Sequence, residues 1–116
     1  MIACTSISPK HANNDIQLKA VNSLMELGFK VYSFNNKQEC KDLEPLYPNV
    51  TFIETYRTLE HHYGKPYVSI NAVLDWCKEQ KEDYFCLINS DIELKTDKAT
   101  VERIKAKMNN NIVLAN

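Results

Sequence analysis

A short polar cluster directly follows a run of apolar residues in the last third of this chain. The run covers residues 84–88, and the cluster after it contains Asn89, Ser90, Asp91 and Glu93. An apolar run of this length, bounded by polar residues, is typical of a strand buried on both faces in the middle of a parallel sheet. Ligands of open α/β sheets bind at the carboxyl ends of such strands. The cluster therefore stands where a binding site is expected.

The side chains of this cluster are oxygen donors, which hard divalent cations such as Mn²⁺ and Mg²⁺ prefer. We expect Asp91 to hold the cation and Glu93 to help. A cation bound to a diphosphate neutralises the charge that develops on a leaving group and holds that group in place. Alternatively, Asp91 begins an ordinary turn and Glu93 is solvated. The position at the end of a buried strand favours the metal site.

Two other predicted strands also end in short polar side chains. Residues 2–8 become polar at Thr5 and Ser6, and residues 31–34 are followed by Asn35 and Asn36. The ends of the first, second and fourth strands of such a sheet can face one crevice. Asn and Ser are also common turn residues, and for Asn35 and Asn36 a plain turn is an equal alternative.

Strands and helices alternate along the whole chain. We predict strands at residues 2–8, 31–34, 50–54, 84–88 and 112–115. Between them the sequence predicts a helix capped by Asn14 or Asp15 and stopped by Gly28, a short helical turn at 38–43, a helix entered at Pro66, and a last helix capped by Asp97. With right-handed crossovers, this order predicts a mostly parallel, twisted α/β sheet flanked by helices on both faces. Residues 1–116 form one small domain.

Apolar residues at helical spacing predict which faces of these helices are buried. The expected inward residues are, for the first helix, Ile16, Ala20, Val21, Leu24, Met25 and Leu27; for the helix after Pro66, Val68, Ile70, Val73, Leu74 and Cys77; for the last, Val101, Ile104 and Met108. Trp76 and Tyr67 have apolar neighbours at the same spacing. We expect both in the core.

Composition excludes several classes of function. The formal net charge is −1, from 14 basic and 15 acidic side chains, so we expect no nucleic-acid partner and no anionic membrane surface. No apolar run approaches the roughly 20 residues of a membrane span, and no secretion signal is visible, which predicts a cytoplasmic protein. With Gly28 and Gly64 as the only glycines, neither a dinucleotide-binding fingerprint nor a Walker A loop can form.

Other reactive side chains have simpler interpretations. The four cysteines lack metal-ligand spacing and are expected to be small buried hydrophobes with free thiols. His61 and His62 lie in a polar loop, where solvation is more usual than metal binding or base catalysis. Arg57 could reach a pyrophosphate, or pair with Glu54 or Glu60; the sequence favours neither.

Taken together, these features resemble glycosyltransferases of the GT-A type. The resemblance lies in the order of elements, the ends of the first two strands, the Tyr63-Gly64-Lys65-Pro66 helix entry with Asn71 one turn inside, and the strand end Asn89-Ser90-Asp91. Enzymes of this type use nucleotide-diphosphate sugars. Their signature is an Asp-x-Asp triplet that binds the metal and the pyrophosphate.

The resemblance implies a role for each matching residue. Asp91 would be the metal ligand, and Asn89 would take the first position of the triplet, beside the ribose or sugar. Thr5, Ser6 and Ile7 would line the nucleobase and ribose. Asn35 or Asn36 would pair with the uracil edge, and Lys65 would contact base or phosphate.

Two departures from the family pattern are visible. Asn89 replaces the first Asp of the triplet, which leaves one carboxylate unless Glu93 helps, and weakens the expected metal affinity. The resemblance covers nearly the whole chain but only the nucleotide-binding half of the family fold, without its acceptor region. We therefore expect a minimal member, of a size typical of a viral or phage genome, which would act in the host cytoplasm.

The sequence thus predicts a metal-dependent hexosyltransferase. Its donor would be a UDP-sugar, with UDP-glucose as the default, and its acceptor is unidentified. Slow hydrolysis of the donor is also expected. The alternative is a non-catalytic nucleotide-sugar-binding module, acting in a homo-oligomer or with a partner that supplies the acceptor site.

Overall fold

The computed structural model of this chain describes residues 1–9, 14–55 and 68–108. Its elements are β1 (Ile2–Thr5), α1 (Asn14–Glu26), β2 (Lys30–Asn35), α2 (Lys37–Leu43), the 3₁₀ turn η1 (Glu44–Leu46), β3 (Thr51–Glu54), α4 (Ile70–Lys78), β4 (Phe85–Leu87) and α5 (Lys98–Lys107). Strand and helix alternate, as the apolar pattern predicts.

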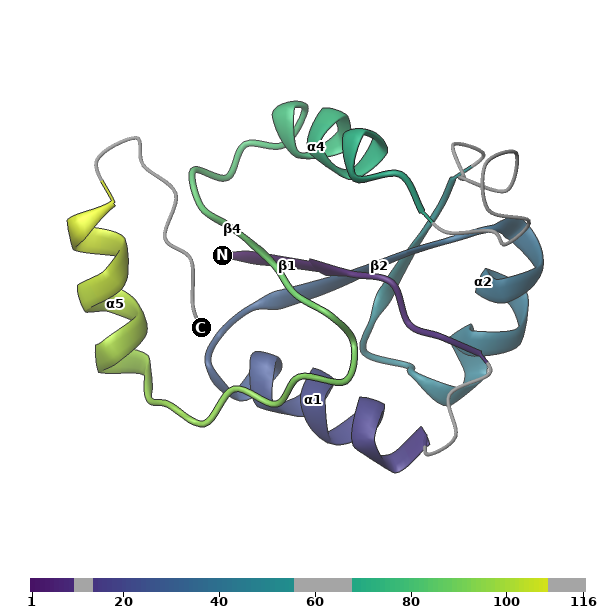
Figure 1. Cartoon of the computed structure of the whole chain (residues 1–116), viewed down its shortest axis with the longest axis horizontal. Coiled ribbons are helices and arrows are strands. Elements are labelled where there is room, and N and C mark those ends of the chain that lie inside the picture. The colour runs from purple at the N-terminus through teal and green to yellow at the C-terminus, as the bar shows by residue number, and fades with distance from the viewer. Residues whose placement is uncertain (10–13, 56–67, 109–116) are drawn as a thin grey trace.

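The strands form one sheet in the order β3-β2-β1-β4, and all neighbouring pairs are parallel. Helices α1 and α4 lie on opposite sides of this sheet, and α2 lies beyond one end of β2 (Figure 1). The prediction of a parallel α/β sheet with helices on both faces is therefore confirmed.

Each face of the sheet has its own apolar core. On the α1 face, Val21 and Leu24 pack with Ala3 and Val31, together with Ile7. On the α4 face, the buried residues are Ile2, Cys4, Phe34, Val73 and Cys77. Trp76 packs there against the rings of Tyr32 and Phe34, at centroid distances of 4.8 Å and 5.2 Å. Trp76 is half-buried and packs against this core, so the prediction that it belongs to the core is confirmed in part.

Helix α1 departs from the predicted apolar stripe at one position. Gly28 adopts a φ of 91° after the helix, the left-handed conformation expected of its stop. Ile16, however, is 44% exposed, whereas Gln17 is fully buried. The buried face is centred on Gln17, Ala20, Val21 and Leu24, which follow helical spacing. The prediction that Ile16 faces inward is therefore wrong, because Gln17 occupies the inward position.

Strand β4 is not the doubly buried central strand that its sequence predicts. It pairs with β1 and stands at the edge of the sheet formed by the described strands, and its residues are half-buried or exposed. Leu87 is 51% exposed. An apolar run indicates that a strand packs against something, but it does not specify the strand's place in the sheet. The fifth strand predicted at residues 112–115 lies outside the described residues.

The last two helices follow their predictions in part. Helix α4 begins at Ile70, because Ser69 is still extended with a ψ of 127°, and the predicted entry at Pro66 lies outside the described residues, as does Tyr67. Asp97 caps α5 as predicted, its side chain accepting a bond of 2.7 Å from the Thr100 N–H. Val73, Cys77 and Val101 are buried, but Ile70, Leu74 and Ile104 are exposed, contrary to prediction.

None of the described helices is long and apolar enough to cross a membrane.

Candidate functional site

The polar cluster forms a turn at the carboxyl end of β4. The Ile88 N–H donates to the Cys4 carbonyl at 3.2 Å, so the pairing with β1 continues one residue beyond the strand. The chain then turns, with the Ile92 N–H donating to the Asn89 carbonyl at 3.3 Å. Asn89, Asp91 and Glu93 are exposed, and Ser90 is half-buried between them. The turn thus presents amide and carboxylate oxygens to solvent.

Parallel pairing brings the other predicted site segments to the same edge of the sheet. Cys4 is the register partner of Leu87, and Thr5 that of Ser33. The residues that follow β1, β2 and β4 therefore begin side by side. The three strand ends thus lie at one edge of the sheet, whereas the predicted crevice and the roles assigned to its residues remain predictions.

A closed ring of hydrogen bonds joins the ends of β1 and β2. The Ile7 N–H donates to Ser33 Oγ at 2.9 Å, and the Ser33 hydroxyl donates to Asn35 Oδ1. The Asn35 amide then donates to the Ile7 carbonyl at 2.9 Å. All three residues are almost completely buried. In this arrangement Asn35 and Ile7 stabilise the strand ends, and a nucleotide contact through their side chains would require this region to open.

Ser6 and Asn36 lie nearer the surface. The Ser6 hydroxyl donates to the Phe34 carbonyl at 2.7 Å, while the residue as a whole is exposed. Asn36 caps α2, because its side chain accepts from the Glu39 N–H at 2.9 Å and Glu39 Oε1 accepts from the Asn36 N–H. Asn36 is half-buried. A capping role accounts for Asn36 without a ligand.

Thr5 has a buried hydroxyl with an open hydrogen-bonding capacity. The residue is 7% exposed, and Thr5 Oγ1 has no hydrogen-bond partner within the described part of the chain. Buried polar groups almost always have a partner in protein or water. Thr5 is the last residue of β1, at the edge where the polar turn lies. Because this oxygen is itself buried, a ligand at this edge could reach it only if the region opened.

Gln17 is the residue of this region that the sequence interpretation missed. Its side-chain amide forms a pair of bonds of 2.9 Å with the Ser8 N–H and carbonyl, and it also accepts from the Ser90 hydroxyl at 2.6 Å. It further hydrogen-bonds the side chain of Tyr47, which partly offsets the rise in the Tyr47 pKa caused by burial. A polar residue at the centre of an apolar helical stripe was the signal that could have identified it.

The donor set of the turn fits a hard cation in kind, but it is small. Asp91 and Glu93 supply carboxylates and Asn89 supplies a carboxamide oxygen. Within the described residues, no group of three or more His, Cys, Asp or Glu side chains could hold a metal ion. Mg²⁺ is usually held by one or two carboxylates together with substrate phosphates and waters. A cation at this turn would therefore need further ligands from a phosphorylated molecule or from water.

The thiols of the chain are not part of this site. Cys4, Cys40 and Cys77 are buried, Cys86 is half-buried, and all four are free. Burial raises the pKa of each thiol, most strongly for Cys4, where the neighbouring Cys77 adds to the effect. Protonated thiols are poor nucleophiles and poor metal ligands. The prediction that the cysteines are small buried hydrophobes is confirmed for the three that are fully buried.

The remaining predicted residues lie on α4 or outside the described residues. Asn71 is exposed in the first turn of α4. Lys65 lies outside the described residues, as do Arg57, His61 and His62. The basic side of the predicted site is therefore a prediction from sequence alone.

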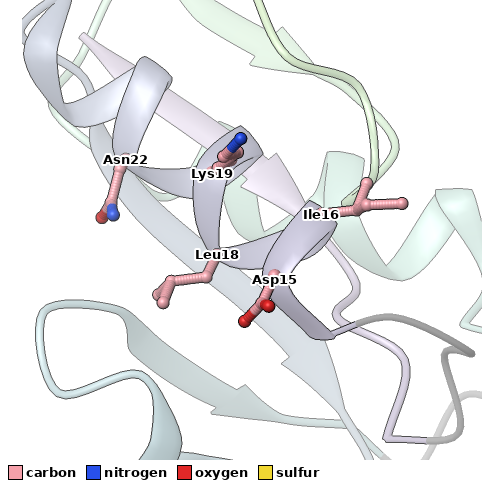
Figure 2. Close-up of a pocket in the computed structure, with 5 residues that line it drawn as sticks. All are labelled: Asp15, Ile16, Leu18, Lys19 and Asn22. Atoms are coloured by element: carbon pink, nitrogen blue, oxygen red, sulfur yellow. The ribbon is translucent and has the colours of Figure 1, made fainter.

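Two hollows in the described part of the chain lie away from the polar turn. One, of about 450 Å³, is lined by Asp15, Ile16, Leu18, Lys19 and Asn22, all from α1. Figure 2 shows Asp15, Leu18 and Asn22 on one side of the helix and Ile16 pointing the other way. The other hollow involves Ile2, Lys30 and Glu82, at the opposite end of the strands. Neither includes a residue of the predicted site.

Comparisons with protein-family models, with curated proteins and with solved structures found no match to this chain. The case for function therefore depends on the fold and the residues at the sheet edge.

Proposed function

We propose that this chain is a metal-dependent glycosyltransferase of the GT-A type that binds a UDP-sugar at the carboxyl edge of its sheet. The observation that supports this proposal is the exposed turn Asn89–Glu93, which stands at a strand end beside the end of β1. The carboxyl ends of parallel strands are where α/β proteins bind nucleotides.

Three residues of the turn have a proposed part in donor binding. Asp91 holds the cation, and Glu93 assists. The cation, when bound, neutralises the charge on the leaving diphosphate. Asn89 contacts the ribose or the sugar through its exposed carboxamide. These roles need accessible oxygen atoms, which the exposure of all three side chains supplies.

The nucleoside would lie toward the ends of β1 and β2. Ser6 and Asn36 retain surface there, and the unsatisfied Thr5 hydroxyl offers a further contact if the region opens. Lys65 would supply a positive charge to base or phosphate, and Asn71 would act from the start of the following helix. Hydrogen bonds to charged groups contribute about 1.5 to 3 kcal/mol each, so Lys65 would be a principal affinity determinant.

We expect slow hydrolysis of the UDP-sugar when no acceptor is added. Water is then the only nucleophile present. A bound acceptor reacts faster than water because positioning it against the donor lowers the entropic part of the barrier. The acceptor is not identified by any residue described above.

The test is UDP release from a panel of UDP-sugars with Mn²⁺, with and without chelator. We expect release that chelator abolishes and that Asp91→Ala greatly reduces. Asp83→Ala is the matched control, because Asp83 is an exposed carboxylate at the opposite end of the same strand and should not matter. Release that survives chelator would refute the metal mechanism. Tight UDP-sugar binding without release would favour the non-catalytic binding module.

A further inference from the structure

Helix α1 holds the acidic turn at two points. The Ser90 hydroxyl donates to Gln17 Oε1 at 2.6 Å, and the Leu94 N–H donates to Ser23 Oγ at 3.2 Å. Gln17 and Ser23 are six positions apart, which corresponds to about 9 Å along a helix. The segment 90–94 therefore lies along α1, with Asp91 and Glu93 between its two attachments.

The attachment through Gln17 is the stronger of the two. Gln17 is fully buried, and its amide also holds Ser8 after β1 through two bonds of 2.9 Å. One rigid amide thus joins the segment after β1 to the turn after β4. A buried amide whose bonding groups are all used costs free energy to displace, because each lost partner would leave an unsatisfied group.

This arrangement restrains the backbone that carries Asp91. Asp91 directly follows Ser90, and both belong to a turn on an edge strand with a neighbour on only one described side. Strand pairing reaches only to Ile88. Beyond that residue, the bond from Ser90 to Gln17 is a tertiary contact that holds the turn against α1.

We propose that Gln17 is a positioning residue for the metal ligand Asp91, acting through the Ser90 hydroxyl. This inference depends on the proposed function, since it takes Asp91 as a ligand. Gln17 touches neither cation nor nucleotide; it restricts the turn to the conformation in which Asp91 and the diphosphate share the ion. Removing hydrogen-bond partners behind metal ligands typically weakens metal binding about 10- to 100-fold.

The experiment measures UDP affinity by calorimetry, with and without Mn²⁺, in three variants. Gln17→Met keeps the volume of the side chain and removes its amide. Ser90→Ala removes only the hydroxyl, and it is the milder variant if Gln17→Met fails to fold. Gln80→Met is the matched control, because Gln80 donates one bond of 3.1 Å to the Trp76 carbonyl at the opposite end of the strands.

We expect Gln17→Met and Ser90→Ala each to reduce the Mn²⁺ enhancement of UDP binding about tenfold. Metal-free UDP affinity should be unchanged, and Gln80→Met should behave as the unaltered protein. The double variant should lose no more than the larger single loss, because residues acting through one bond are not additive. Ser90→Thr, which keeps the hydroxyl, should restore the enhancement. Full enhancement in folded Ser90→Ala would overturn the proposal.

A second readout separates this inference from the proposed function. Backbone order parameters of residues 89–93 report whether the turn is held, whether or not a metal binds. We expect values typical of rigid backbone in the unaltered protein and a fall toward about 0.6 in Gln17→Met and Ser90→Ala. No Mn²⁺ effect in the unaltered protein would refute the proposed function and with it the metal-positioning role, and the fall in order parameters would then show only that Gln17 holds the turn. Unchanged order parameters would overturn the positioning role by themselves.

Discussion

The strand ends of β1 and β2 and the strand end of β4 carry similar short polar residues in opposite environments. Around the first two, Ser33 and Asn35 are buried and joined in a ring with the Ile7 backbone. After β4, Asn89 and Asp91 are exposed. Similar residue types at equivalent positions of one sheet edge thus perform different tasks.

The difference follows from the neighbours of each strand. β2 lies between β1 and β3, and α2 begins directly after it, so its end is enclosed. β4 pairs with β1 alone within the described sheet. Enclosed polar groups must bond one another to offset the loss of water, whereas exposed groups keep contact with water. Burial therefore separates residues that shape the edge from residues that can bind at it.

Asn35→Ala tests this comparison on the buried side and should have the largest effect on stability. It leaves the Ser33 hydroxyl and the Ile7 carbonyl without the partners they have here, at a cost of about 2 to 4 kcal/mol of unfolding free energy. Chemical denaturation measures the change. Asp91→Ala, on the exposed side, should lie within about 0.5 kcal/mol of the unaltered protein. Equal losses in the two variants would contradict the division between shaping and binding residues.

Thr5→Val tests a residue that is buried at the end of β1 but whose hydroxyl has no hydrogen-bond partner among the described residues. Valine keeps the shape and removes the unsatisfied hydroxyl, so stability should stay the same or rise by about 1 kcal/mol. UDP affinity should fall if the hydroxyl contacts the nucleotide. Denaturation and calorimetry on the same variant decide the matter: a clear loss of stability would show that the hydroxyl bonds a buried water, and unchanged UDP affinity would remove Thr5 from the site.

Substitution of Asp97, which caps the helix that follows the exposed turn, should have the smallest effect on stability. The hydrogen bond from the Thr100 N–H lowers the pKa of the Asp97 carboxyl. The contribution of this cap to the stability of α5 is therefore present above the unfolded pKa of about 4, and it is lost as the pH falls through the lower folded value. Asp97→Ala should therefore speed amide exchange in α5 at neutral pH, with the difference shrinking in acid. Asp97→Asn, which still caps, should stay close to the unaltered protein. Equal exchange in both variants would show that the cap does not hold α5.

Much of the fold could be predicted from local sequence. Strand positions follow from short apolar runs, α1 ends where Gly28 supplies a left-handed residue, and α5 begins where Asp97 caps it. The alternation of strand and helix implies parallel pairing because each crossover returns the chain in the same direction. These features depend on residues close together in the chain, and pattern and turn chemistry therefore determine them.

Only the tertiary structure decided which polar residues are buried and where β4 stands. Gln17 and Ile16 are adjacent on one helix. Gln17 can be buried because its amide hydrogen-bonds Ser8 and Ser90, which come from other segments of the chain. Asn35 ends β2 and Asn89 follows β4, yet Asn35 is buried and Asn89 is exposed. Burial depends on which segments meet in space, and such contacts between distant residues leave no periodic signal in the chain.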